Sequence, residues 1–244
     1  LLLILDSFEH LITASTWLAS LLQAAPQVKI LVTSRQRLNL QAAIVLPVYE
    51  LAIPAADPAI RVEQLLTYPS VQLFVERGQR VRPTFRLHAG NAADVAQICR
   101  QMAGVPLGIE LAATLLLLYS PAQIVAQLTV NALTLRTEWL DWPQRHQSIE
   151  EVLTTSWRLL STDEAALLAR LAVIKGDFMV EEAITIGDAH SATLFALVDK
   201  SLLRQTSDDD SHFTMHDLVR DYALRQLRQQ PAMEMATYKR HAAY

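Results

Sequence analysis

Residues 1–10 read LLLILDSFEH, and this stretch decides how the beginning of the chain is interpreted. Five apolar residues run directly into Asp6, and residues 8–24 follow with leucines at helical spacing. A continuous apolar run of this length predicts a strand that is buried on both faces. We therefore expect a buried strand that ends in a carboxylate, followed at once by a helix.

Two further apolar runs resemble the first one. Residues 29–33 read KILVT, and residues 43–48 read AIVLPV, so both predict strands. Buried apolar strands that alternate with helices are typical of a parallel α/β sheet. We expect residues 1–55 to be the remnant of such a sheet, of the P-loop kind.

The pattern becomes helical after residue 55. Apolar residues at helical spacing predict a helical bundle over residues 56–135. The polar and aromatic run EWLDWPQRHQ, residues 138–147, reads as a linker. Residues 136–230 then carry two capping-box patterns, Ser148 with Glu151 and Ser161 with Glu164, four or more helices and a hairpin around an acidic turn. That order describes a winged-helix domain, and residues 231–244 read as the start of a following helical region.

Composition limits the classes of function. The formal net charge is −4, which does not suit a chain that coats nucleic acid. The single cysteine, Cys99, allows no internal disulfide and favours a cytoplasmic location. The most apolar stretch, residues 107–119, is too short to cross a bilayer and contains Glu110, so no membrane partner is expected.

Asp6 and Arg35 are the candidate catalytic residues. Each follows an apolar strand, and the carboxyl ends of parallel strands meet at the ligand edge of an α/β sheet. There Asp6 can hold Mg²⁺ beside phosphates, or it can simply cap the next helix. Arg35 can reach a terminal phosphate with its forked donors, or it can be a solvated loop residue.

Pro106 and His216 are the candidate cofactor-binding residues. Pro106 follows Gly104 and begins an apolar helix; it can lie against an adenine or can merely start that helix. His216 precedes the last predicted helix of residues 136–230. It can bind a phosphate, or it can be an exposed residue beside a helix capped by Asp217.

The order of four motifs is more specific than any one of them. LLLILDSFEH, ILVTSR, GVPLGIELAA and FTMHDLVRDYA follow one another, with LVDKSLLR before the last. In this order they resemble the NB-ARC type of signal-transduction ATPases with numerous domains (the STAND or AP-ATPase family), as found in large bacterial transcriptional regulators. The resemblance covers essentially the whole chain.

The resemblance implies specific roles for these residues. Asp6 would be the Walker B aspartate that holds Mg²⁺ through water, and Arg35 the sensor arginine. Pro106 would lie against the adenine, and His216 would contact the β-phosphate of ADP. In such proteins the resting state clamps ADP, and exchange for ATP opens the clamp and allows other protomers to assemble.

Two departures from the family pattern matter. No G-x-x-x-x-G-K-[ST] phosphate loop occurs in the sequence, so we expect it upstream in a longer regulator that also carries effector and helical-repeat domains. Residues 1–244 alone should then bind ADP or ATP with Mg²⁺ weakly or not at all. The residue after Asp6 is Ser7 rather than a second acid, so at most slow ATP hydrolysis is expected.

Three hypotheses for function remain open at this point. The first is a nucleotide-dependent switch module. The second is a DNA-binding winged helix, which the weakly charged residues 191–200 and the acidic turn Asp208–Asp210 disfavour because phosphates require clustered positive charge. The third is an interaction scaffold that binds no nucleotide.

Overall fold

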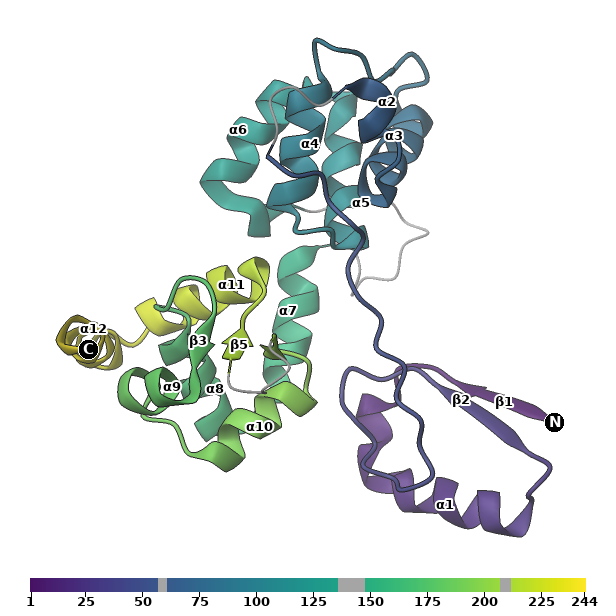
Figure 1. The fold of residues 1–244 in the computed structure, drawn as a ribbon, viewed down its shortest axis with the longest axis vertical. Helices are drawn as coiled ribbons and strands as arrows, with labels where there is room; N and C mark the ends of the chain where they lie inside the picture. The colour runs from purple at the N-terminus through teal and green to yellow at the C-terminus, as the bar shows by residue number, and fades with distance from the viewer. Residues whose placement is uncertain (57–60, 136–147, 207–211) are drawn as a thin grey trace.

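The computed structural model describes residues 1–56, 61–135, 148–206 and 212–244. The chain is mainly helical and forms three successive parts (Figure 1). A small α/β segment comes first, a helical bundle follows, and a group of helices around a small sheet comes last. A single extended stretch leads from the α/β segment to the bundle (Figure 1).

The α/β segment contains two parallel strands and the helices between them. Its elements are β1 (Leu2–Leu5), a 3-10 helix (Phe8–Ala14), α1 (Ser15–Ala24) and β2 (Lys29–Val32). The strands pair in parallel, with Leu2 opposite Lys29 and Leu5 opposite Val32. The prediction of two parallel strands joined by a helix is therefore confirmed. The prediction that these strands are buried on both faces is wrong, because their residues alternate between exposed and half-buried. Two strands are too few to identify a P-loop sheet.

The prediction of a third strand at residues 43–48 is wrong. These residues form no regular structure, and their apolar side chains are exposed, with Ile44 at 88% and Val48 at 96% of full exposure. Pro47 interrupts the run and cannot donate a ladder hydrogen bond, which disfavours a central strand. The stretch instead begins the extended connection to the bundle.

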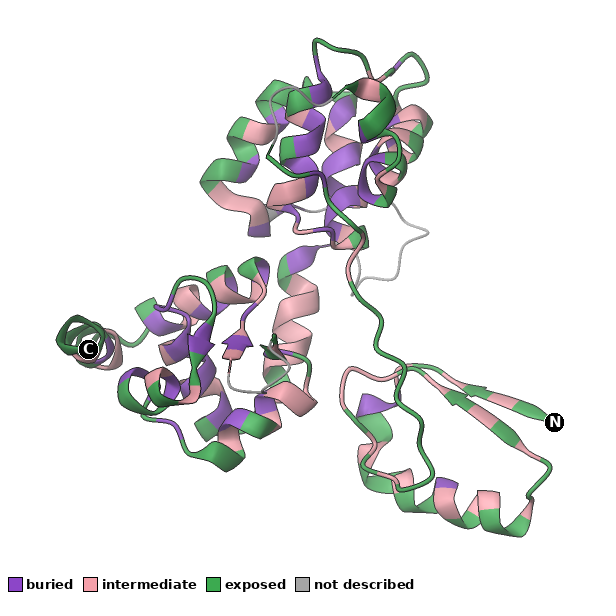
Figure 2. Ribbon diagram, in the orientation of Figure 1, coloured by how far each residue is buried: buried purple, intermediate pink, exposed green. Residues whose placement is uncertain are grey.

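The helical bundle follows the predicted order of helices. It contains α2 (Val62–Leu65), α3 (Pro69–Val81), α4 (Ala92–Gln101), α5 (Pro106–Thr114), a 3-10 turn (Leu115–Leu117), α6 (Pro121–Asn131) and a last 3-10 turn (Ala132–Thr134). Helix α5 is buried on several sides between its neighbours (Figure 2). Ser120 caps α6 through a reciprocal bond with Gln123, as its sequence predicts.

The last part combines helices with a three-stranded antiparallel sheet. Its helices are α7 (Ile149–Arg158), α8 (Thr162–Leu171), α9 (Val180–Gly187), α10 (Ser191–Asp199) and α11 (Asp217–Arg228). The strands β3 (Phe178–Met179), β5 (His212–Thr214) and β4 (Arg204–Gln205) lie in that order across the sheet. The β4–β5 hairpin confirms the predicted wing. The expected linker and acidic turn lie outside the described residues.

One of the two predicted capping boxes is present. Ser161 accepts a hydrogen bond from the Glu164 N–H, and Glu164 bonds back to the Ser161 N–H. Ser148 makes no capping bond to α7, so that prediction is wrong. The backbone there is extended, and the next N–H, that of Ile149, donates to the Leu135 carbonyl.

The bundle and the last part share a continuous core. Ile149 of α7 and two residues of α11, Leu218 and Tyr222, pack into the apolar cluster of the bundle. Trp157 lies 5.6 Å from the Tyr222 ring, which joins α7 to α11. A final helix, α12 (Pro231–Ala243), packs on α9. None of the described helices is long and apolar enough to cross a membrane.

Candidate functional site

Asp6 lies at the carboxyl edge of the parallel strands. The Thr33 hydroxyl, at the end of β2, donates to the Asp6 carboxylate and accepts a hydrogen bond of 3.0 Å from the Ser7 N–H. Ser7 adopts a left-handed backbone, with φ of 57°. The carboxylate is therefore fixed by the neighbouring strand, and Ser7 rather than Asp6 occupies the cap position of the next helix.

Arg35 lies at the same edge but turns toward helix α7. Its Nη1 donates to the Ser156 hydroxyl at 2.8 Å and to the Val152 carbonyl at 3.4 Å. Its Nε lies 3.6 Å from a Glu9 carboxylate oxygen, and its backbone N–H donates to the other oxygen at 3.3 Å. Arg35 is thus a bridge between the α/β segment and α7, and not a freely solvated loop residue.

A second contact, made by Arg37, also joins the turn after β2 to the last part of the chain. The Arg37 N–H donates to the Asp199 carbonyl at the end of α10, at 3.2 Å, and the two side chains form a long ion pair of 3.9 Å. The turn after β2 is therefore docked on two helices of the last part. Both contacts are polar, and the Arg35 and Arg37 side chains are partly exposed.

Pro106 follows a tight turn at the end of α4. Ala103 and Gly104 both have left-handed backbones, with φ of 47° and 75°. The Leu51 N–H donates to the Gly104 carbonyl at 3.0 Å, so the extended connection crosses this turn closely. Pro106 occupies the first turn of α5, as predicted, and its ring is exposed.

His216 caps helix α11 and lies against the same turn. Its Nδ1 accepts a hydrogen bond of 3.1 Å from the Leu218 N–H, which leaves the ring proton on Nε2 when the ring is neutral. Nε2 is buried beside the Ala103 carbonyl, which favours the protonated ring, but the two atoms do not form a hydrogen bond of normal geometry. Burial lowers the pKa of His216, and the Glu50 carboxylate opposes this only in part. Asp217 does not cap the helix and pairs with Arg220 instead.

Glu50 and Arg204 complete this cluster and were not predicted from the sequence. Both Glu50 carboxylate oxygens accept from Arg204 Nη2, at 2.8 and 2.7 Å. The Arg204 guanidinium also lies 5.3 Å from the centre of the Tyr49 ring. Burial would raise the pKa of Glu50, but the hydrogen bond from Arg204 and its charge outweigh this, so the pKa is lowered. The connection is thereby tied to the wing strand β4.

The four predicted residues thus fall into two groups. Asp6 and Arg35 share the strand edge, and Pro106 lies next to the turn that His216 contacts. Each group includes contacts between different parts of the chain. Among the described residues, no three acidic, histidine or cysteine side chains cluster as a metal site.

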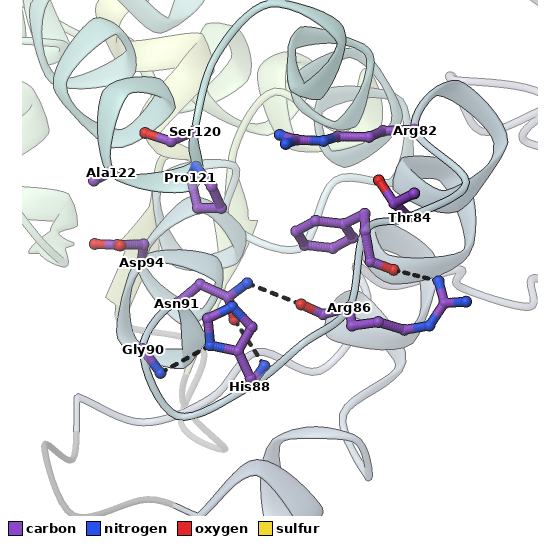
Figure 3. Close-up of a pocket in the computed structure, with 11 residues that line it drawn as sticks. Arg82, Thr84, Arg86, His88, Gly90, Asn91, Asp94, Ser120, Pro121 and Ala122 are labelled. Carbon is purple, nitrogen blue, oxygen red and sulfur yellow. Dashed lines mark hydrogen bonds between the residues drawn. The ribbon is translucent and has the colours of Figure 1, made fainter.

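A cavity on the bundle lies away from these residues. It has a volume of about 390 Å³ and is lined by Arg82, Phe85, His88, Asn91 and Pro121, among others (Figure 3). The cavity is at the beginning of α4, whereas the Gly104 turn is at the end of that helix. None of the predicted site residues lines it.

Comparison with known proteins defines one part of the chain. Residues 160–228 match the family described as "Winged helix-turn-helix domain". This range begins just before α8 and ends with α11, and it includes the β4–β5 hairpin. The chain therefore contains a winged helix-turn-helix domain, and the sequence prediction of a winged helix is confirmed.

Relatives match over nearly the whole chain. "Uncharacterized protein Rv0894" of Mycobacterium tuberculosis is 33% identical over 98% of this chain, which spans 61% of that protein. "Putative HTH-type transcriptional regulator Rv0890c" of the same organism is 33% identical over 100% of this chain, which spans 27% of it. The chain is thus related to transcriptional regulators of the helix-turn-helix type, and matches only part of each relative.

Proposed function

We propose that residues 1–244 are the switch module of a nucleotide-dependent transcriptional regulator, in which ADP is clamped between the α/β segment and the winged helix. The observation that carries the proposal is the position of His216. Its buried Nε2 lies beside the Ala103 carbonyl but makes no well-formed hydrogen bond among the described residues, at a turn where three parts of the chain meet. A buried donor without a partner is costly, and an anionic oxygen would satisfy it.

The strand edge supports the same function. Asp6 is fixed by Thr33 at the carboxyl end of β1, where α/β sheets bind their ligands. Arg35 lies two residues beyond Thr33 and has a guanidinium that can recognise phosphate. These residues provide part of a site for Mg²⁺ and a nucleotide phosphate. The proposal also requires a phosphate loop, which residues 1–244 do not contain.

In this proposal the bound nucleotide supplies negative charge that holds the parts together. Asp6 would orient water on Mg²⁺, Pro106 would lie against the base and His216 would donate to the β-phosphate. The residue after Asp6 is Ser7 and not a second acidic residue. Exchange of ADP for ATP, rather than rapid hydrolysis, would therefore reset the switch. Opening would free the winged helix for contacts with other protomers or with adjoining domains.

Calorimetric titration of the full gene product with ADP and Mg²⁺ tests this function. We expect micromolar or tighter binding, which weakens at least tenfold in Asp6→Asn. Asp94→Asn, on the bundle, is the matched control and should bind as the wild type does. Residues 1–244 alone should show little or no binding. Absence of binding to the full product would reject the switch and favour an interaction scaffold.

Direct DNA binding is the second candidate, because the winged helix-turn-helix match and the related regulator favour it. The charges of α10 do not favour DNA binding. Lys200, which directly follows this helix, donates to Glu164 at 2.5 Å and to the Leu159 carbonyl at 2.9 Å, so its charge is already used. Asp199 is paired with Arg37. A shift of generic duplex DNA at low salt by residues 1–244 would support this candidate over the switch.

A further inference from the structure

We infer that Glu9 and Ser156 set the preference of this module for a diphosphate over a triphosphate. The inference rests on the proposed function, in which Arg35 senses a terminal phosphate. It concerns two residues to which neither the sequence motifs nor the comparisons give a role. The geometry that carries it is the set of bonds that Arg35 makes to them.

Arg35 cannot bind a terminal phosphate through two parallel N–H groups while it keeps its present partners. Nη1 is committed to the Ser156 hydroxyl and the Val152 carbonyl on α7, and Nε faces the Glu9 carboxylate. A guanidinium binds phosphate through two parallel N–H groups on one edge. Reorienting that edge toward a phosphate would break the contacts to α7. Triphosphate binding and the α7 contact therefore compete for the same donors.

Glu9 makes this competition costly for the triphosphate. Its side chain is only 4% exposed, and its carboxylate oxygens contact the backbone N–H and the Nε of Arg35. When the Arg35 side chain leaves, the buried carboxylate keeps a single neutral donor from that residue. A buried charge that loses its partner is strongly destabilised. Glu9 thus favours the state in which Arg35 stays on α7.

A diphosphate has no γ-phosphate to attract Arg35, so it leaves these contacts intact. A ligand can shift an equilibrium only by its different affinity for the two states. Weakening the Glu9 or Ser156 contact should therefore raise the affinity for triphosphate and leave the affinity for diphosphate nearly unchanged. Release of Arg35 from Ser156 would at the same time undock the α/β segment from α7.

The test measures dissociation constants of ADP and of a non-hydrolysable ATP analogue for the full gene product, by calorimetry with Mg²⁺. In Ser156→Ala and in Glu9→Gln, the ratio of the triphosphate to the diphosphate constant should fall about five- to tenfold. The matched control is Thr155→Ala, because within the described part of the chain the Thr155 hydroxyl bonds to the Glu151 carbonyl of its own helix and not to Arg35. This control should leave the ratio unchanged.

The outcomes separate the inference from the proposed function. An unchanged ratio in folded Ser156→Ala, with both nucleotides still bound, overturns the inference and leaves the switch intact. If the wild-type product binds neither nucleotide, the proposed function fails and the inference fails with it. Ser156→Ala removes the hydrogen bond from Arg35 and a bond of 3.2 Å to the Val152 carbonyl within the same helix. Because Ser156 is only half-buried, this variant keeps the test decisive even if Glu9→Gln disturbs folding.

Discussion

Replacement of Gly104 by alanine tests the crossing of the extended connection over the α4–α5 turn. Gly104 has a left-handed backbone with φ of 75°, a conformation that costs an L-residue about 1–2 kcal/mol. An added Cβ would also lie 2.2 Å from the Leu51 carbonyl oxygen, so the backbones would have to separate. Their separation would lengthen the bond from the Leu51 N–H to the Gly104 carbonyl, which is now 3.0 Å.

The chain contains a matched control for the free-energy cost of the left-handed backbone. Gly176 has φ of 84°, but an added Cβ there meets no atom within 4 Å. Gly176→Ala should therefore cost only the left-handed strain, about 1 kcal/mol. Gly104→Ala adds the close contact, about 1–3 kcal/mol, and the weakened hydrogen bond, about 1 kcal/mol. We expect a loss of about 4 kcal/mol for Gly104→Ala.

Urea unfolding of residues 1–244, followed by far-ultraviolet circular dichroism, measures both variants against the wild type. The unfolding midpoint should fall much further for Gly104→Ala than for Gly176→Ala. Equal shifts would refute the reasoning, because they would mean that Leu51 does not lie against the turn in solution. The result bears directly on His216, which contacts the same turn.

Three other predictions concern separate parts of the chain. Burial raises the pKa of Cys99 to about 12, so the native protein should resist thiol reagents at pH 8 and react fully in urea. Lys200 and the Ser161 N–H outweigh burial and lower the pKa of Glu164 from 4.5. The stability from this pair is therefore present above about pH 4.5 and lost as the pH falls below it. In thermal melts, Glu164→Gln should be less stable than the wild type at pH 7 and should not show this loss of stability at acidic pH. Leu31 and its neighbours expose an apolar strand face, so residues 1–244 should aggregate in light scattering, and Leu31→Thr should reduce the aggregation rather than leave it unchanged.

The sequence predicted those features that depend on local patterns. Helical periodicity located the bundle helices and α7 to α11, and the Ser161 capping box needs only residues close together in the chain. The two parallel strands were also predictable, because a continuous apolar run has few alternatives. The apolar run at residues 43–48 led to a wrong strand prediction. Apolar composition does not show whether a neighbouring strand is available for pairing.

The site residues that were missed are those defined by distant contacts. Glu50 and Arg204 are 154 positions apart, and Arg35 and Ser156 are 121 apart, so no local pattern could pair them. Glu9 and Arg35 are 26 positions apart, so their contact also depends on how the turn after β2 folds.

Nucleotide retention by the full gene product is the most direct test of the central claim. The purified protein is denatured, and the released nucleotide is identified and counted by chromatography, for wild type, His216→Ala and the exposed control His190→Ala. The account predicts about one ADP per chain in wild type and control, and loss or faster exchange of ADP in His216→Ala. Nucleotide-free protein in all three, or equal retention in all three, would contradict the clamp.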